Sequence, residues 1–419
     1  MDTPASPSPN VFRHRDFRMF WGARFSLTLA VQAQAVAIGW QVYDVARRSK
    51  SVQEGAFLVG MVGLAQFLPL VLLTLIGGET ADRYGRRTIV LTCLAGEAVL
   101  AAALALIALH PAPALWPIFT VAALFGAARA FLSPASGALG PMLVPRDELP
   151  RAVAWNSLAW QSGAVIGPWI GGALCAVSPA ASYAAATALY LLSVLLLSQV
   201  RTDTRPQAQP GRRGELIGEG LRYVWANKIV FGSISLDLFA VLLGGATALL
   251  PVFARDVLGG GPDTFGILRS GPAIGAGIVA LLLARFHMHR CAGLWMFGGV
   301  AVFALATVAF ALSRQLWLSV VLLAVLGGAD MISVYVRQTL VQVVTPDAMR
   351  GRVAAVSYLF IGASNELGEF ETGLVAGVLG PVRACLIGGI GALGVTGLWA
   401  WMFPALRKAD RLDAPDTPA

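Results

Sequence analysis

The chain has 419 residues, of which 57% are hydrophobic and 13% are charged, and its mean hydropathy is +0.70. Because a soluble protein is roughly 45–50% apolar and about 25% charged, this composition excludes an ordinary cytosolic enzyme. A helix that spans a bilayer needs about 20 mostly apolar residues, so the chain has room for about a dozen spans.

We predict an all-α membrane protein with twelve transmembrane helices in two six-helix halves. Uncharged runs and turn residues mark the spans. The uncharged runs are 55–78, 98–128, 152–200, 291–313 and 384–406, and the spans interrupted by isolated charges lie near 19–45, 229–254, 262–285, 315–344 and 353–377. The predicted parts are a cytoplasmic N-terminal segment (1–18), a first bundle (19–200), a cytoplasmic linker (201–228), a second bundle (229–406) and a cytoplasmic C-terminal tail (407–419).

The distribution of basic residues predicts that both termini are cytoplasmic. With this orientation most of the 31 Lys and Arg residues fall in inner loops, and only the first outer loop, with Arg47, Arg48 and Lys50, opposes the trend. The net charge of +8 therefore reports topology, and we expect no nucleic acid partner. No short apolar core with a cleavage site follows the N-terminal segment, so we expect no cleaved signal peptide.

A basic, glycine-containing loop follows the second predicted span. It contains Gly78, Asp82, Arg83, Gly85, Arg86 and Arg87. The glycines let helices approach closely, the aspartate can cap a helix or pair with an arginine, and the arginines hold the loop at the inner surface. This pattern resembles the loop signature of the major facilitator superfamily, which implies twelve spans in two halves and transport by alternating access. The aspartate is missing from the equivalent loop, residues 284–290.

The fifth predicted span carries closely spaced glycines and a proline: Gly163, Gly167, Pro168, Gly171 and Gly172. Glycines four residues apart form a groove for helix packing, and the proline bends the helix. The pattern resembles the antiporter motif of exporters in the same superfamily. A tight packing face with no bearing on the direction of transport remains an alternative.

The linker 201–228 divides the chain and contains a helix-like stretch. Its apolar residues are Leu216, Ile217, Leu221, Val224 and Trp225. Together with Arg222 and Lys228 they fit an amphipathic helix on the anionic inner leaflet, and a solvated linker is the alternative.

The two halves repeat one another with a displacement of 201 positions. The matching pairs are Pro145 with Pro346, Arg151 with Arg352, Gly126 with Gly327, Gly167 with Gly368 and Gly172 with Gly373. Each half is therefore interpreted as a copy of one unit, which places a substrate site between the halves near mid-bilayer.

The eleventh predicted span contains three acids, Glu366, Glu369 and Glu371. A carboxylate inside a bilayer is costly, so it usually faces a cavity or a partner, and burial disfavours its charged form. Glu366 and Glu369 share a helix face, whereas Glu371 points elsewhere. Two roles remain open for the pair: proton coupling or cation binding, and structural pairing with Arg129 or Arg337.

Further charges lie inside predicted spans. Arg129 and Asp330 are related by the same displacement, so we expect them to face each other, either as a gate or proton-linked switch or as a fixed ion pair. The resemblance implies that spans 1, 4, 7 and 10 line the cavity, and the cavity candidates are Arg24, Gln32, Gln34, Arg129, Asp237, Asp330 and Arg337. The candidates for proton coupling are Glu366, Glu369, Asp330 and Asp237. Arg269 is expected to pack or to snorkel.

We expect no cofactor, no metal and no enzymatic activity. None of the lysines Lys50, Lys228 and Lys408 follows a glycine, so no phosphate-binding loop of the G-K-[ST] kind is present. The four cysteines stand far apart, and the histidines lie at span ends or in loops.

The hypothesis is a monomeric, proton-coupled exporter of the bacterial inner membrane, whose partners are a small amphipathic molecule, protons and the lipid bilayer. Residues 347–352 and 364–369 resemble the branch of the superfamily that contains enterobactin exporters and macrolide efflux proteins, which implies a siderophore-like or drug-like substrate. An importer of the same fold and a membrane receptor that moves nothing are the alternatives.

Overall fold

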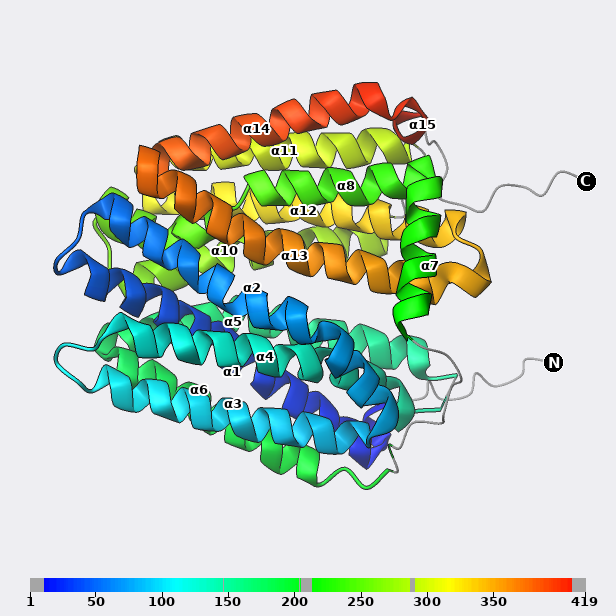
Figure 1. Cartoon of the computed structure of the whole chain (residues 1–419), viewed down its shortest axis with the longest axis horizontal. Helices are drawn as coiled ribbons and strands as arrows, with labels where there is room; N and C mark the ends of the chain where they lie inside the picture. The colour runs from blue at the N-terminus through cyan, green and yellow to red at the C-terminus, as the bar shows by residue number, and fades with distance from the viewer. Residues whose placement is uncertain (1–10, 146, 203, 205–212, 287–290, 409–419) are drawn as a thin grey trace, which may run out of the picture.

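The computed structural model describes residues 11–145, 147–202, 204, 213–286 and 291–408, and these residues form helices and connecting segments without a strand. The long helices run side by side along the long axis of the molecule, and both ends of the chain lie at the same end of the bundle (Figure 1). We call this end the termini end and the opposite one the far end.

The first half of the chain contains six long helices. They are α1 (Arg15–Arg47), α2 (Val52–Arg83), α3 (Arg86–Ala108), α4 (Leu115–Leu139), α5 (Leu149–Val177) and α6 (Pro179–Ser198). Local sequence explains where several begin: Ser51 and Glu54 form a reciprocal capping box at the start of α2, and Ser178 caps α6 before its proline.

The second half follows a linker helix, α7 (Arg213–Ala226), and again crosses the bundle six times. Its long helices are α8 (Lys228–Leu243), α10 (Pro262–Arg285), α11 (Ala292–Leu312), α12 (Leu316–Val344), α13 (Asp347–Leu379) and α14 (Pro381–Met402), and a short α15 (Pro404–Arg407) ends the described chain.

The seventh crossing departs from the single helix expected over 229–254. It breaks after α8 and continues through η3 (Ala246–Leu249), α9 (Leu250–Val252) and the π-helical η4 (Phe253–Val257). The break falls at Gly244 and Gly245, where α13 approaches so closely that a Cβ on Gly245 would lie 2.7 Å from the carbonyl oxygen of Gly368. Glycine permits both the break and the approach.

Nine of the described helical segments are long and apolar enough to span a membrane. The other three crossings, α1, α5 and α13, are long enough but more polar, because α1 and α5 carry amide side chains and α13 carries three glutamates. Polar side chains inside a membrane usually face another helix or a cavity, so these three crossings are expected to lie in the interior of the bundle.

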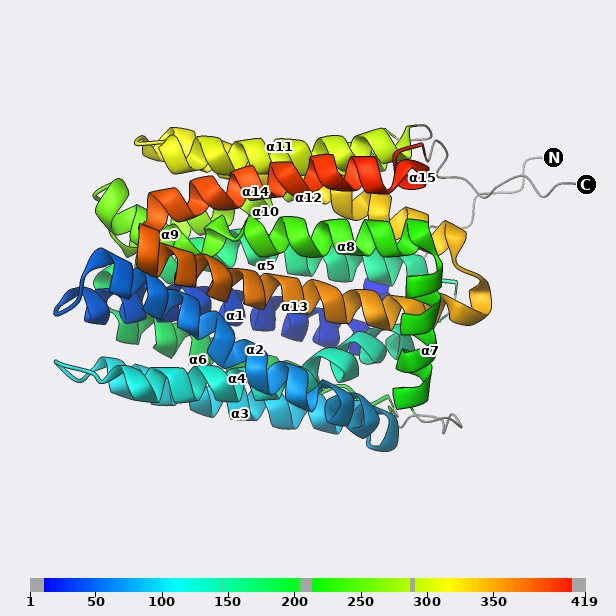
Figure 2. The same ribbon diagram turned by 45° about the horizontal axis from the view of Figure 1, so that its top comes forward.

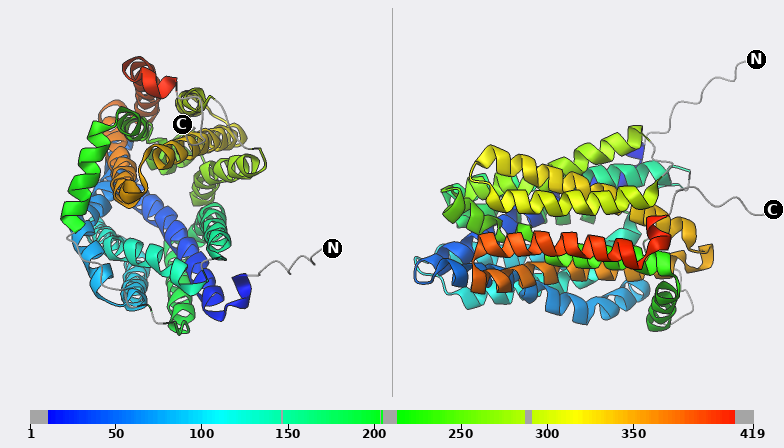
Figure 3. Two further views of the ribbon diagram at one scale, coloured as in Figure 1. Left: turned by 90° about the vertical axis from the view of Figure 1, so that its right-hand side faces the viewer. Right: turned by 90° about the horizontal axis from the view of Figure 1, so that it is seen from above.

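Two pairs of helices, α2 with α13 and α5 with α10, make the main contacts between the halves. Figure 2 shows α13 running along α2 in a tilted view, and Figure 3 shows the bundle from the termini end and from above. The remaining helices of each half pack mostly on one another.

These two contacts are copies of one another. At the first, a Cβ on Gly172 would lie 2.5 Å from the carbonyl oxygen of Pro262 and 2.9 Å from Cα of Gly266. At the second, a Cβ on Gly373 would lie 2.5 Å from Cα of Gly60. Because Gly172 and Gly373 correspond in the repeat, the structure confirms the pseudo-twofold relation between the halves. Both crossings lie toward the far end.

The linker helix α7 crosses the termini end and packs on α8 and α13 of the second half (Figure 1). Val224 is buried there, Tyr223 donates a hydrogen bond to the carbonyl of Val344 (3.1 Å), and Glu219 pairs with Arg352 (2.5 Å). A freely solvated linker is therefore wrong, because one edge of the helix is buried against protein. Trp225, 64% exposed, remains available to a lipid surface; Leu216 and Ile217 lie outside the residues whose side chains are described.

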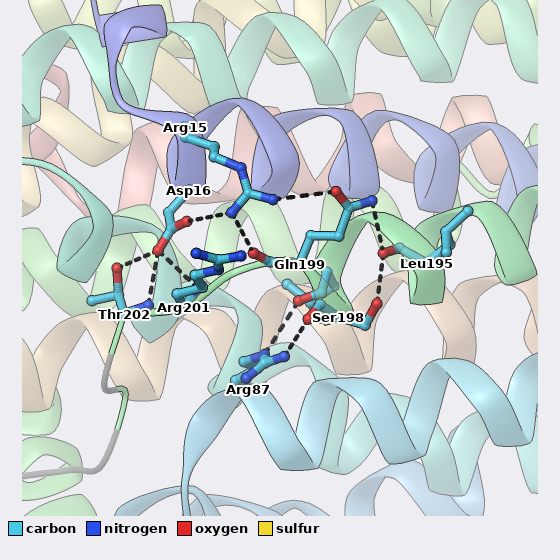
Figure 4. A network of polar contacts seen from close by, with 9 residues as sticks. Arg15, Asp16, Arg87, Leu195, Ser198, Gln199, Arg201 and Thr202 are labelled. Atoms are coloured by element: carbon cyan, nitrogen blue, oxygen red, sulfur yellow. Dashed lines mark hydrogen bonds and ion pairs between the residues drawn. The ribbon is translucent and has the colours of Figure 1, made fainter.

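A polar network joins α1, α3 and the end of α6 at the termini end (Figure 4). The carboxylate of Asp16 accepts hydrogen bonds from the amides of Arg201 and Thr202 and from the Thr202 hydroxyl. Burial alone would raise the pKa of Asp16, but these hydrogen bonds outweigh it and hold the pKa below its usual value. The network fixes the start of the linker against the first half.

Candidate functional site

A small central cavity of about 50 Å³ lies between the two halves. It is mostly apolar and contains three polar side chains, Gln66 from α2, Arg269 from α10 and Glu369 from α13. Its walls come from α1 and α2 on one side and from the broken seventh crossing, α10 and α13 on the other. A cavity built jointly by both halves changes shape whenever the halves move.

Glu369 reaches this cavity because α2 has no side chain opposite it. A Cβ on Gly63 would lie 2.9 Å from Cβ of Glu369 and 3.2 Å from its Oε2. The charges of Arg269 and Arg129 act on the Glu369 carboxylate, and so does the negative charge of Glu366. Glu369 therefore forms part of a central group of ionisable residues.

The position of Arg269 corrects the expectation that it packs or snorkels, because it lines the central cavity beside Glu369. The pseudo-twofold relation gives the reason. Gly60 and Gly266 correspond, so Arg269 corresponds to Gly63, and Pro168 corresponds to Glu369. One crossing therefore contributes an arginine and the other a glutamate, and the two charges meet near the axis.

Arg129 does not face Asp330, and that prediction is wrong. Its Nη1 lies 2.9 Å from Oε1 of Glu366 on α13, so the ion pair joins α4 of the first half to the second half. The repeat predicts equivalent depths for Arg129 and Asp330, but Arg129 points to α13, whereas Asp330 lies beside Asp237 of α8. Of the two roles left open for Glu366, pairing with Arg129 is the contact the structure contains.

A second group of charges lies inside the second half. Arg337 on α12 forms an ion pair with Asp237 on α8, and their side chains are 5% and 8% exposed. Asp330 lies within electrostatic range of both and lines a small cavity with Asp237 and Ser333. None of the three lines the central cavity, in contrast to the expectation for Asp237, Asp330 and Arg337, because α8 and α12 turn these side chains toward each other.

The other cavity candidates on α1 lie inside the first half. Arg24 donates to the hydroxyl of Ser136 on α4 (3.3 Å). Gln34 is buried, and its Oε1 has no hydrogen-bond partner within the described residues. Gln32 packs against α5, where a Cβ on Gly167 would lie 2.6 Å from its Cβ. None of the three lines the central cavity.

The glycines of the fifth span work as a packing surface in this structure. Three of them, Gly163, Gly167 and Gly171, let α5 approach α1, and the fourth, Gly172, faces α10. The backbone of Pro168 also contacts α10, because a Cβ on Gly266 would lie 2.4 Å from its carbonyl oxygen. The motif therefore packs α5 against α1 of its own half and against α10 of the other half. Glycines at this spacing predict such close helix packing.

The arginines of the loop signature fasten helix ends within the first half. Arg86 donates to the carbonyl of Ala138 at the end of α4 (3.2 Å), and Arg87 donates to the carbonyls of Leu197 and Ser198 at the end of α6 (Figure 4). Cations at helix C-termini are favourable because the last carbonyls lack helical partners.

The remaining signature residues have smaller local roles. Arg83 pairs with Glu79 one turn earlier, Gly85 is the N-cap of α3, and Gly78 is buried in α2. The side chain of Asp82 lies outside the described part of the chain.

Sequence reasoning missed Glu97. It lies in the middle of α3 with 1% of its surface exposed, and its Oε2 has no hydrogen-bond partner within the described residues. The charge of Arg129 acts on it. In the sequence, Glu97 directly precedes the uncharged run 98–128. An acid in this position looks like a residue at the end of a span as long as its depth in the membrane is unknown.

The far end is closed by charged residues from both halves. Asp44 and Arg47 at the end of α1 pair with Arg255 (2.7 Å) and Asp256 (3.3 Å) of η4, and Tyr43 donates a hydrogen bond to Asp256. Together with the two glycine crossings, these contacts hold the halves together at the far end. We call Asp44, Arg47, Arg255 and Asp256 the far-end latch.

Reversing one charge of the latch is expected to open the far end. In Asp44→Arg the new cation repels Arg255, and because partly exposed ion pairs contribute about 0.2–1 kcal/mol each, the open population should rise by several-fold. A cysteine placed at Ala35 in the central cavity, labelled with a membrane-impermeant maleimide from the far side, reports this change. The double variant Asp44→Arg/Arg255→Asp should return labelling to the starting level; equal labelling of all three proteins would contradict the assignment.

Twelve crossings in two equivalent halves, with a central cavity between them, define a secondary transporter of the major facilitator superfamily. The chain belongs to the transmembrane secretion effector family, whose model matches residues 5–417. It is 28% identical over 399 residues to the enterobactin exporters EntS of Shigella boydii serotype 18 and of Escherichia coli O139:H28, and in each case the match covers 94% of this chain and 93% of the relative.

Solved structures share the fold. A D-xylose-proton symporter aligns with a TM-score of 0.71 at 15% identity, over 94% of this chain and 98% of that one. The xylose transporter XylE from E. coli aligns with a TM-score of 0.69 at 14% identity (94% and 96%), and a bacterial homologue of the iron transporter ferroportin with 0.68 at 16% (95% and 100%). These identities support the fold only.

Proposed function

We propose that this transporter exports a siderophore-like molecule and that an inward flow of protons drives it. The observation that carries the proposal is the meeting of Glu369 and Arg269 in the central cavity, one charge from each of two symmetry-equivalent crossings. When a carboxylate beside an arginine binds a proton, it becomes neutral and no longer attracts the guanidinium, so the two side chains can separate.

The substrate class follows from the chemistry of the cavity region and from the relatives. Arg129 and Arg269 bring fixed positive charge to the centre of the bundle, where oxygen-rich or anionic groups are attracted, and the rest of the cavity wall is mostly apolar. The relatives named above are enterobactin exporters. A siderophore with oxygen-rich groups on a partly apolar frame would suit both the positive charge and the apolar wall.

The cavity must widen before it holds such a molecule. About 50 Å³ accommodates one or two water molecules, whereas pockets for drug-sized ligands have roughly 300–1,000 Å³. We infer that the structure is a contracted state with its far end closed, and that loading requires the halves to separate toward the termini end.

The positive-inside rule assigns the termini end to the cytoplasm, so the latch lies on the outer side. The termini end carries the arginines of the loop signature and of the α1 and α6 network. We propose a monomer in the bacterial inner membrane, with each half contributing one wall of a single path.

Reconstitution into liposomes with an imposed pH gradient tests this function. Enterobactin, other siderophores and a panel of drugs are added to the side that the termini end faces, with the opposite compartment acidic. We expect at least one siderophore to collapse the gradient. We expect Glu366→Gln or Asp330→Asn to slow the collapse by about tenfold, which corresponds to about 1.4 kcal/mol, and Glu369→Gln to slow it further.

Three outcomes separate the alternatives. Substrate movement toward the termini-end side in the same vesicles would favour an importer of this fold. Tight binding without flux would favour a receptor, for which the intramembrane acids are dispensable. Equal flux with and without the gradient, in every variant, would overturn proton coupling.

A further inference from the structure

We propose that Glu97 is a proton-carrying residue of the transport cycle and that Arg129 is shared between Glu97 in its own half and Glu366 in the other half. The inference rests on the proposed function, because it adds a residue to the same coupling machinery. It concerns a side chain that neither the loop signature nor the motif of the fifth span contains.

Glu97 lies where a permanent charge is expensive. It is 1% exposed, α3 is packed against α4 and α6 around it, and its neighbours on α3, Leu94, Ala98 and Ala101, belong to the hydrophobic core. One of its carboxylate oxygens is buried without a hydrogen-bond partner within the described residues. A buried carboxylate of this kind is stable only when it is neutral or when a cation approaches it.

Three groups lie within electrostatic range of Glu97. Arg129 from α4 is the cation, Tyr190 from α6 has a buried hydroxyl without a partner among the described residues, and Cys93 lies one turn earlier on α3. Neither the phenol nor the thiol supplies a positive charge. Arg129 is therefore the group among these three that can stabilise an ionised Glu97.

Arg129 is held elsewhere in the observed state. Its guanidinium pairs with Glu366 at 2.9 Å, while Glu369 also lies within electrostatic range. The Arg129 side chain is 40% exposed and that of Glu366 12%, so the pair borders open space, whereas Glu97 lies behind it in the core of the first half. An arginine keeps its charge, and it is positioned between acids that belong to different halves.

The proton count follows from this arrangement. While Arg129 pairs with Glu366, Glu97 keeps its proton and is neutral. When the halves separate toward the termini end and Glu366 withdraws, Arg129 turns to Glu97, which releases its proton, while Glu366, which borders open space, is hydrated and stays ionised. One proton therefore leaves the protein when the ion pair between the halves is broken, and it leaves toward the side from which substrate is loaded. Raising the pH ionises Glu97 and therefore favours the separated arrangement.

The test measures the distance between the halves without any substrate. Full-length protein with its native cysteines replaced by alanine carries spin labels at the exposed termini-end positions Tyr84 and Arg285, and the distance distribution is recorded in lipid nanodiscs across the neutral pH range. We expect the ratio of open to closed termini ends to change by about tenfold over the titration in the parent protein and by less than about twofold in Glu97→Gln.

Glu97→Asp keeps an ionisable group and is expected to retain the titration with a displaced midpoint, which tests the proposal even where Glu97→Gln does not fold. Glu371→Gln, on the partly exposed side of α13, is the matched control and should titrate like the parent. An unchanged titration in Glu97→Gln, an undisplaced midpoint in Glu97→Asp, or a parent protein whose distances ignore pH would overturn the proposal. The distance measurement uses no substrate, so it is independent of the liposome experiment. A failure to export enterobactin in liposomes would therefore overturn the proposed function but not the role of Glu97.

Discussion

Glu369→Gln is expected to lose gradient-driven export almost completely while the protein still folds and inserts. Glutamine has the size of glutamate but cannot bind or release a proton, and it leaves the charge of Arg269 in the central cavity without its neighbouring carboxylate. Removing one member of a buried charge pair costs about 3–5 kcal/mol, so the rate should fall by about a hundredfold or more. The measurement is substrate-dependent dissipation of a pH gradient in proteoliposomes.

The matched control for this variant is Glu371→Gln. Glu371 lies two residues further along α13, contacts the hydroxyl of Thr372, and does not line the central cavity. Its removal should leave transport within about twofold of the parent, as is usual for a substitution away from buried pairs. An equal loss of activity in both variants would mean that this part of α13 tolerates no amide, and it would contradict a specific role for Glu369 in the central cavity.

Gly172→Val is expected to block the transport cycle by a different route. The valine Cβ would lie 2.5 Å from the carbonyl oxygen of Pro262 and 2.9 Å from Cα of Gly266, so α5 and α10 could no longer cross at their present distance. Overpacking of this kind typically costs 1–3 kcal/mol, which would shift the far-end equilibrium toward the open form by roughly tenfold or more. Labelling of a cysteine at Ala35 from the far side should rise accordingly.

Gly298→Val is the control for this prediction, because a Cβ on Gly298 would meet nothing within 4 Å. It introduces the same side chain into an exposed helix face and should leave labelling unchanged. If Gly172→Val transports at the rate of the parent, the glycine crossings are not the surfaces on which the halves are held together.

The spacing of glycines predicted much of the fold, because backbone contact leaves a strong trace in sequence. Wherever two helices touch through their backbones, only glycine fits, and the repeated glycines Gly172 and Gly373 therefore revealed the duplication. That these two glycines lie where the halves meet is visible only in the structure. The span count followed from apolar length in the same way. The break at Gly244 and Gly245 was missed because the seventh crossing stays apolar throughout.

The pairing of charged residues was harder to predict, because the depth of a residue in the membrane does not determine which helix its side chain faces. Arg129 and Asp330 occupy equivalent depths, yet one points to α13 and the other to α8. The position of Arg269 was predicted wrongly because α2 and α10 do not correspond at the displacement of 201 positions that relates the rest of the two halves. Its correspondence to Gly63 follows only from the helix crossings in the structure. Glu97 was missed because a single acid near the middle of a helix is indistinguishable from one at its end until the core is seen.

Alternating access requires the halves to exchange a closed far end for a closed termini end around Glu369 and Arg269. This exchange can be measured with two label pairs in the same reconstituted protein: Ser49 with Gln315 at the far end, and Tyr84 with Arg285 at the termini end. When enterobactin and a pH gradient are supplied, we expect the far-end distance to lengthen as the termini-end distance shortens. Export that proceeds while both distances stay fixed would contradict it.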